Sequence, residues 1–479
     1  MANNDPVLIP YVIQEGSFWY VAYKEKNPFV PEITVSAKGI ANHMSEEIND
    51  GCDFGPDSYN PSVTSGVPLT QTSGIQEAII YAVSTIQLHY GDVSNDTSII
   101  PIFPNIKLGV GFFEVNANIN LQPLASAKVN GISHISGMGP YNTVIGFAND
   151  LNGFIGNNVG IEFLMEDITF APLSTTDTPN YYIYFTSSNT NTTSVYKFVR
   201  CVFTNAYPGT TVNDYAVYMD SPQARTIIFE DCGWNVNGQN NLYINGNGTT
   251  PRQVILKNST TVSGGNGNFE FLNVPIVVID NYVIGAIVAG TVDAIHLSHC
   301  YWGNGSSSIM AVNSNVSAIE ISNSYISTST SAIITSDNSS NTVGVLSVKN
   351  TIIDIGADTV LASNFKVTEY IEKGLLTILN GYTFDFPGQT SVSGTTAGSF
   401  VANQINYENG YKKVIIYLNA YENDSTTAQT YTFPVAFSTV AVISTNSASV
   451  PGVSTSLTEF SIAPDTTTAY TGIIVIEGY

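Results

Sequence analysis

The chain has 479 residues and a formal net charge of −23, with 11% charged residues against about 25% in ordinary proteins. Its 43% hydrophobic content argues against a disordered chain. The 15 basic residues are scattered, which argues against a nucleic-acid partner, and the longest apolar stretch (274–292) contains Asp280 and Asn281, which argues against membrane insertion.

The chain begins with a segment, residues 1–65, that we interpret as an ordered entry or attachment segment. A helix is predicted next, in "SGIQEAIIYAVSTIQLHYG" (73–91), from a helical period of apolar residues: Ile75, Ile79, Ala82, Val83 and Ile86. Alternating strands follow at 108–123. An amphipathic helix in this place can cover the exposed backbone edge of the first strands, so we predict a small capping helix.

A repeat occupies the middle of the chain. Two alternating apolar residues lead to a central position, which is held by Asp167, Arg200, Asp231, Asn258, Asn281, His299, Asn323 and Asn350. The spacing of two points both apolar side chains inward on a short strand, and Asn or Asp tolerates a left-handed corner. Intervals of 18 residues (281 to 299) to 33 residues (167 to 200) predict a right-handed parallel β-helix over 66–372.

Three cysteines, Cys201, Cys232 and Cys300, directly follow a central position and are interpreted as one core column. Cys201 and Cys232 fall in consecutive coils, about 5 Å apart and within disulfide reach. We favour a stacked pair of free thiols, because no second pair shares the pattern. His299 is interpreted as a corner residue, and without CxxC spacing neither a metal site nor a cofactor is expected.

The pattern changes after residue 373. Short runs with period-2 alternation, separated by turn residues, predict strands at 412–423, 428–434, 438–445, 456–464 and 471–479. This spacing predicts a C-terminal antiparallel β-sandwich over 373–479. The predicted fold class is therefore all-β.

Outward-facing carboxylates are the candidate catalytic residues: Glu166, Glu230 and Asp280. Glu166 and Glu230 are two coils apart, about 10 Å between backbones, which is close to the separation used by inverting glycosidases. The competing interpretation is that they are solvated surface residues. No GxSxG motif and no aspartate cluster with a neighbouring arginine supports other hydrolase or lyase chemistry.

Several phrases of the sequence resemble known families. The series "GIQEAI", "GFFEVNANINL" and "ISGMGPYNTVI", followed by the Asn-rich coils, is similar to the pectin-lyase-like β-helix family over about 70–370. The end "GIIVIEGY" looks like the knob of viral tail fibres and spikes. The phrases "YVIQEGSFWYVAYKE", "INDGCDFGPDSYNP" and "TQTSGIQEAI" resemble a tail fibre or spike structural protein of spindle-shaped viruses of hot-acid archaea, the fuselloviruses.

The last resemblance implies a thermostable homotrimer on the virion surface, at the tail or pointed end. It would lie beside other virion tail proteins and contact a glycan or glycoprotein on the host cell, outside the cell. The alternatives are a glycan-cleaving hydrolase or lyase spike and a cellular surface adhesin. An adhesin would be expected to carry a secretory signal, and the first residues show none. Tyr181 and Tyr182 are candidates for sugar stacking, against the interpretation that they are ordinary members of a Tyr-rich chain.

Overall fold

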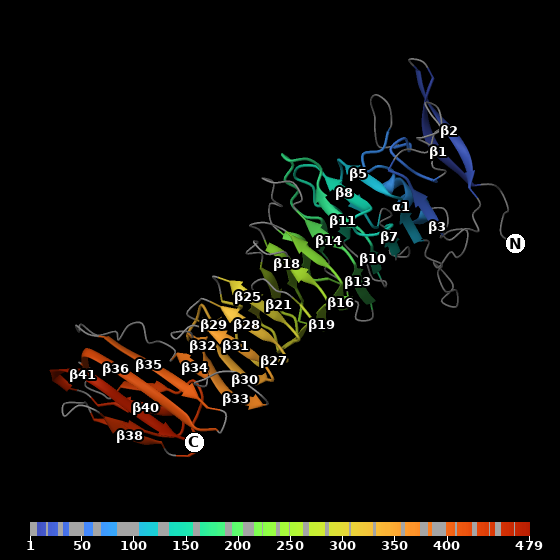
Figure 1. Ribbon diagram of the computed structural model, residues 1–479. Helices are drawn as coiled ribbons and strands as arrows, with labels where there is room; N and C mark the ends of the chain where they lie inside the picture. Colours follow the sequence, from blue (N-terminus) through green and yellow to red (C-terminus); the bar gives the residue numbers. More distant parts are fainter. Residues whose placement is uncertain are drawn as a thin grey trace. The chain divides into compact units, whose positions relative to one another are not determined.

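The computed structural model describes residues 7–479 apart from 16–17, 27–31, 38–51, 61–68, 84–104, 123–133, 157–162, 187–193, 205–214, 223, 236–239, 249, 262–267, 283–286, 306–307, 329–331, 356–359, 374–381, 386–398, 408–409, 424–428, 440, 446–451 and 464. The chain divides into two compact units, Met1–Phe269 and Glu270–Tyr479. Within the described residues both units are built from β-strands, with one short helix in the first (Figure 1). The domain boundaries expected at 65 and 372 stay predictions.

The first unit contains three parallel sheets, and each coil after the first gives one strand to each sheet. The first sheet holds β3 (Glu32–Val35), β4 (Asn105–Leu108), β7 (His134–Ser136), β10 (Phe163–Glu166), β13 (Ser194–Val199), β16 (Ala224–Glu230) and β19 (Gln253–Lys257). The second holds β5 (Gly111–Val115), β8 (Thr143–Phe147), β11 (Thr169–Pro172), β14 (Val202–Thr204), β17 (Gly233–Asn235) and β20 (Thr260–Thr261). The third holds β6 (Ile119–Asn120), β9 (Phe154–Gly156), β12 (Ile183–Thr186), β15 (Tyr215–Asp220) and β18 (Asn240–Asn245).

A hairpin of β1 (Val7–Glu15) and β2 (Phe18–Lys26) precedes these sheets. Strand β3 pairs in parallel with β4, so the first sheet begins inside the segment that the sequence assigned to chain entry. Its alternating burial, with Ile33 and Val35 inside, is the same pattern that later coils repeat.

The second unit repeats the same plan. Its first sheet holds β22 (Ile276–Asp280), β24 (Ala294–Ser298), β27 (Val316–Ser322), β30 (Thr342–Lys349) and β33 (Lys366–Lys373). Its second holds β25 (Tyr301–Gly305), β28 (Tyr325–Thr328) and β31 (Ile352–Ile355), and its third holds β23 (Ile287–Gly290), β26 (Met310–Val312), β29 (Ala332–Thr335), β32 (Val360–Ser363) and β34 (Tyr382–Asp385). Strand β21 (Phe269–Leu272) begins at the last residue of the first unit.

Antiparallel pairing starts at β34 and builds the C-terminal end of the second unit. One layer holds β35 (Ser399–Asn406), β36 (Lys412–Asn423), β41 (Asp465–Gly478) and β38 (Val442–Thr445), and the other holds β37 (Gln429–Thr432), β40 (Glu459–Ile462) and β39 (Val453–Thr455). Both layers contribute to one buried core that includes Ile416, Phe460 and Ile474. The structure therefore confirms the predicted all-β fold class, with a parallel β-helix and a C-terminal β-sandwich.

The corner column, defined as the eight central positions of the repeat, has one backbone conformation throughout. All eight residues, none of them glycine, have φ between +45° and +61°. Hydrogen bonds between coils continue on both sides of the corner. The N–H of Arg200 donates to the carbonyl of Glu230 (2.9 Å), and that of Val202 donates to the carbonyl of Ile168 (2.9 Å). The left-handed residue therefore turns the chain without leaving unpaired backbone groups.

At six of the eight corners, the next residue closes the turn with a side-chain hydrogen bond. Its thiol or hydroxyl donates to the carbonyl oxygen two residues back, in the pairs Cys201–Val199, Cys232–Glu230, Ser259–Lys257, Cys300–Ser298, Ser324–Ser322 and Thr351–Lys349. Cysteine, serine and threonine all carry a donor at this distance from the backbone. The column interpreted from the sequence as small core residues is thus also a column of hydrogen-bond donors.

Aromatic rings stack in the core on β11, β14 and β17 of the second sheet. The rings of Phe170 and Phe203 lie 5.1 Å apart, and those of Phe203 and Trp234 lie 4.5 Å apart, both nearly parallel. Stacked aromatic pairs stabilise by about 0.5–1.5 kcal/mol beyond the burial of their area. These rings occupy equivalent positions in successive coils, so each coil fixes the register of the next.

A single helix, α1 (Ile75–Tyr81), lies at the start of the β-helix, where the sequence predicted one; residues 84–91 lie outside the described part. Its Gln76 side chain hydrogen-bonds the backbone of β6 at the edge of the third sheet, as a neighbouring strand would. The Gln76 amide donates to the carbonyl of Asn120 (3.1 Å) and accepts its N–H (2.5 Å). The Ser73 hydroxyl donates to the carbonyl of Glu114 (2.8 Å). The helix and the residue Ser73 before it thus satisfy backbone groups at the edge of the described sheets.

A second set of left-handed corners follows strands of the third sheet, and the sequence analysis missed it. It comprises Ser221, Asn273, Thr291 and Asn364, with φ from +52° to +64°. Two of the four are not Asn, although apolar residues stand four and two positions before each of them, as in the corner column. A mixed column of this kind gives little signal in a single sequence.

We expect Ser324→Ala to lower the free energy of unfolding by about 1–3 kcal/mol. The hydroxyl donates to the carbonyl of Ser322 (2.7 Å) and accepts the N–H of Cys300 (3.0 Å), and both bonds are buried or nearly so. Ser324→Cys, which restores a donor, should recover most of the loss. Urea unfolding measures both, with Ser327→Ala on the outer face as the control. Equal stability of Ser324→Ala and the parent would contradict the role of the donor.

The Gln76 contact predicts a local effect. In Gln76→Ala the N–H of Asn120 loses its acceptor and should exchange with deuterium about tenfold faster. In Gln76→Glu the acceptor oxygen remains, so this amide should stay protected. Hydrogen exchange with mass spectrometry of a peptide covering β6 distinguishes the two. Unchanged protection in Gln76→Ala would show that another group covers this edge.

Candidate functional site

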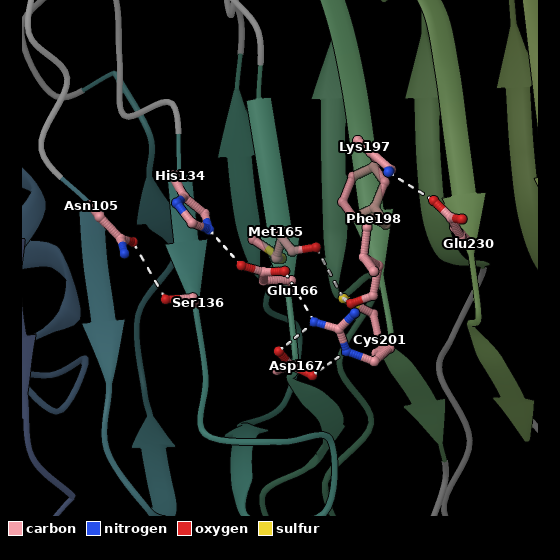
Figure 2. A network of polar contacts seen from close by, with 12 residues as sticks. Asn105, His134, Ser136, Met165, Glu166, Asp167, Lys197, Phe198, Cys201 and Glu230 are labelled. Atoms are coloured by element: carbon pink, nitrogen blue, oxygen red, sulfur yellow. Dashed lines mark hydrogen bonds and ion pairs between the residues drawn. The ribbon is translucent and has the colours of Figure 1, made fainter.

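Charged side chains line the outer face of the first sheet in the N-terminal unit (Figure 2). Strand register places one column across β10, β13, β16 and β19: Glu166, Val199, Glu230 and Lys257. The two carboxylates predicted as a catalytic pair therefore lie two coils apart in one column, with Val199 between them.

Glu166 lies between two basic groups. Its carboxylate is 2.9 Å from Nε2 of His134 and accepts a hydrogen bond from Nη2 of Arg200 (3.1 Å). Arg200 also donates to both oxygens of Asp167, each at 2.7 Å, and this pairing raises the pKa of Arg200. The guanidinium of Arg200 thus bridges Asp167, which belongs to the same corner column, and the outward-facing Glu166.

Glu230 is held by two lysines. Nζ of Lys197 donates at 2.7 Å, and Nζ of Lys257 lies 3.7 Å away. The hydrogen bond from Lys197, more than the other contacts, lowers the pKa of Glu230. Glu230 therefore stays ionised at neutral pH and is poorly suited to donate a proton.

These contacts bear on the glycosidase hypothesis. An inverting glycosidase needs one carboxylic acid that is protonated at working pH, with a raised pKa, and one ionised base. Glu230 has the opposite shift, and Glu166 is engaged by Arg200 and His134. The pairing of both residues favours an ion-pair network on the surface, and the catalytic role stays an untested prediction.

The third candidate, Asp280, lies on the outer face of the second unit. It accepts hydrogen bonds from the Ser298 hydroxyl (2.7 Å) and lies 3.0 Å from Nδ1 of His299. Nearby, Glu320 accepts from Nζ of Lys349 (2.8 Å), which lowers the pKa of Glu320. His299 is thus a corner residue whose ring contacts a carboxylate of the preceding coil.

The cysteines of the core column are buried thiols. Cys201, Cys232 and Cys300 are buried and form no disulfide. Burial raises the pKa of Cys201, and it raises the pKa of Cys300 to about 12. A thiol that stays protonated at neutral pH is neither a nucleophile nor a metal ligand. Among the described residues, no group of three or more His, Cys, Asp and Glu side chains could hold a metal ion.

A tyrosine row occupies the outer face of the third sheet in the first unit. It comprises Tyr184, Tyr218 and Tyr243, which are in register on β12, β15 and β18. The ring centroids lie 5.3 Å and 4.7 Å apart, with interplanar angles of 16° and 4°. Tyr181 and Tyr215 pack against this row at a tilt.

The two tyrosines named from the sequence have different positions. Tyr181 is half-buried beside the tyrosine row, but Tyr182 is fully buried, and its hydroxyl donates to the carbonyl of Thr204 (2.9 Å). Tyr182 as an exposed sugar-stacking residue is therefore wrong, because neighbouring side chains point to opposite sides of the chain. The sequence analysis did not identify the tyrosine row, whose members lie 34 and 25 residues apart (184 to 218, 218 to 243).

Comparison with known proteins finds no matching family model and no matching curated protein. Among solved structures, the chain is similar to ORF18 of Geobacillus virus E2, with 11% identity over 88% of this chain and 79% of that chain, and a TM-score of 0.42. It is also similar to the tailspike protein gp49 of Acinetobacter baumannii bacteriophage Fri1, a capsular polysaccharide depolymerase, with 12% identity over 99% of this chain and 90% of that chain, and a TM-score of 0.40. In the described part of the chain, no helix has the length and apolarity needed to span a membrane.

Glu230→Gln should destabilise the fold at pH 7 by about 0.2–1 kcal/mol, and the difference from the parent should be smaller at pH 3. The pKa of Glu230 in the folded chain lies below its ordinary value of 4.5, so its ion pairs stabilise above that pH and are lost as pH falls through the folded value. Urea unfolding at both pH values measures this. Glu114→Gln, on the exposed outer face of β5, is the control. A difference of the same size at pH 3 would show that packing, and not charge, accounts for the effect.

Proposed function

We propose that the chain is a subunit of a virion tail fibre or tail spike that attaches to the host cell surface. The observation that carries this proposal is the regular display of outward side chains, one per coil, on in-register parallel strands. Such a surface repeats along the coils instead of converging on one pocket. Extended surfaces of this kind suit the binding of long or repetitive partners better than the conversion of a small substrate.

The scaffold supports a mechanical role. Parallel strands in the middle of each sheet are hydrogen-bonded on both sides, and the corner column keeps these bonds between coils. At the start of the β-helix, α1 covers part of the backbone edge. A backbone paired in this way resists local opening, which a protein under load at a cell surface requires.

The candidate catalytic side chains favour binding over chemistry. Glu166 and Glu230 are held in ion pairs, and burial keeps the thiols of Cys201 and Cys300 protonated. A glycan-cleaving spike is the second candidate function, because both glutamates face outward in one column two coils apart.

The resemblance to virus fibres extends the proposal to assembly. We propose a homotrimer on the virion surface, at the tail or pointed end, in contact with other tail proteins and with a host glycan or glycoprotein. Several identical subunits bind a cell surface more tightly than one, because each contact raises the effective concentration of the next. The C-terminal β-sandwich gives such an assembly a second kind of surface besides the coils.

The attachment proposal predicts that purified chain binds to host cells and slows adsorption of the virus that carries it. Gold-labelled antibody against the chain should mark one end of the virion in electron micrographs. Sedimentation of the chain with cells measures binding, and light scattering measures the oligomeric state. Failure to bind cells, together with absence of the label from virions, would contradict the proposal.

The same samples test cleavage. If the chain only attaches, glycans released from these cells keep their length after incubation, and Glu166→Gln and Glu230→Gln bind cells as the parent does. Shortened glycans with the parent but not with either variant would instead make the chain a glycan-cleaving enzyme. Mass spectrometry of the glycans reads out both results, with Glu114→Gln as the matched carboxylate control.

A further inference from the structure

We propose that the tyrosine row on β12, β15 and β18 binds an uncharged linear glycan. This inference rests on the proposed attachment function and assigns it a surface and a ligand class. The surface lies on the third sheet, whereas the ion pairs of Figure 2 lie on the first, so the two sets of side chains face different sides of the β-helix.

The row has a polar companion two residues further along each strand. Register aligns Thr186, Asp220 and Asn245 beside Tyr184, Tyr218 and Tyr243, so three successive coils each carry one tyrosine and one small polar residue. All six side chains are half-buried, which leaves part of each in contact with solvent. Each coil therefore offers a similar two-residue subsite.

The repetition points to a repetitive ligand. Ring centroids follow one another at 5.3 Å and 4.7 Å, set by the stacking of the coils. A linear glycan also presents the same groups once per sugar unit. A protein partner, by contrast, has no reason to match identical subsites in consecutive coils. We therefore favour a polymer of sugars as the occupant.

The chemistry of the row fits sugar hydroxyls. A tyrosine combines an apolar ring with a hydroxyl that donates and accepts hydrogen bonds, and it loses little conformational entropy on binding. Because the three rings stack face to face, their edges and hydroxyls point outward, and their positions are fixed before a ligand arrives. The Asn245 amide donates to Oδ1 of Asp220 (3.0 Å), which orients a carboxylate that has further acceptor sites for ligand hydroxyls.

The charge of this surface selects against anionic ligands. Strands β9, β12, β15 and β18 contain no lysine or arginine, and Asp220 is their single acidic residue. A uronate polymer or a phosphate-bearing chain would meet a carboxylate without a compensating cation from these strands. An uncharged glycan meets no such repulsion.

The test uses the full-length chain and two probe sets. Isothermal titration calorimetry is run with neutral glycans released from cells to which the chain attaches, and with hexagalacturonic acid as the anionic probe. Tyr218→Ala should weaken neutral-glycan binding about tenfold or more, as expected for a central contact residue, and Tyr218→Phe should weaken it a few-fold by removing only the hydroxyl. Tyr325→Ala is the matched control, because Tyr325 stacks on Tyr301 in the second unit with the same spacing of 5.3 Å.

The outcomes separate this inference from the attachment proposal. Neutral-glycan binding that is lost in Tyr218→Ala and kept in Tyr325→Ala supports the inference, with circular dichroism showing that both variants fold. Binding of hexagalacturonic acid alone, no binding of neutral glycans by the parent, or parent-like binding by Tyr218→Ala and Tyr218→Phe would overturn it. If those variants still bind cells, attachment stands and uses another surface. If the parent binds no cells, the attachment proposal itself fails.

Discussion

The structure depends on a corner that turns the chain while its hydrogen bonds to the neighbouring coils continue. A residue with positive φ at each corner costs about 1–2 kcal/mol for most side chains, and least for Asn and Asp. The cost is offset because every coil can then pair with its neighbours, and because at six of the eight corners the thiol or hydroxyl of the next residue donates back across the turn. Without this corner, the strands of successive coils would lose their register, and the buried side chains and the outward side chains would no longer align from coil to coil.

Much of this arrangement could be predicted because it repeats. The corner column combines a nearly uniform residue type with apolar residues at fixed spacing, so eight weak signals reinforce one another. The capping helix was predictable from its own period. By contrast, the corners at Ser221 and Thr291 do not share a residue type with Asn273, so the apolar residues before them were not recognised as a second column.

The contacts of the candidate site were harder to predict than its columns. Alternation along the strands was enough to place Glu166 and Glu230 on the outer face. The basic residues that contact them depend on how neighbouring strands align, and the loop lengths set that alignment. Lys197 reaches Glu230 because β13 and β16 align with a specific offset, and Arg200 reaches back to Asp167 from the next coil. These contacts make both carboxylates members of an ion-pair network, which alternation alone could not predict.

The nearest-neighbour pairing of coils has an evolutionary consequence. Each coil is bonded to the one before and the one after, and the β-helix is covered by α1 at its start and passes into antiparallel strands at its end. Duplication or deletion of one coil in the interior would therefore leave both endings intact and change the reach by about 4.8 Å, the strand spacing. A lineage could therefore gain or lose whole coils in equal steps without changing the residues at either end.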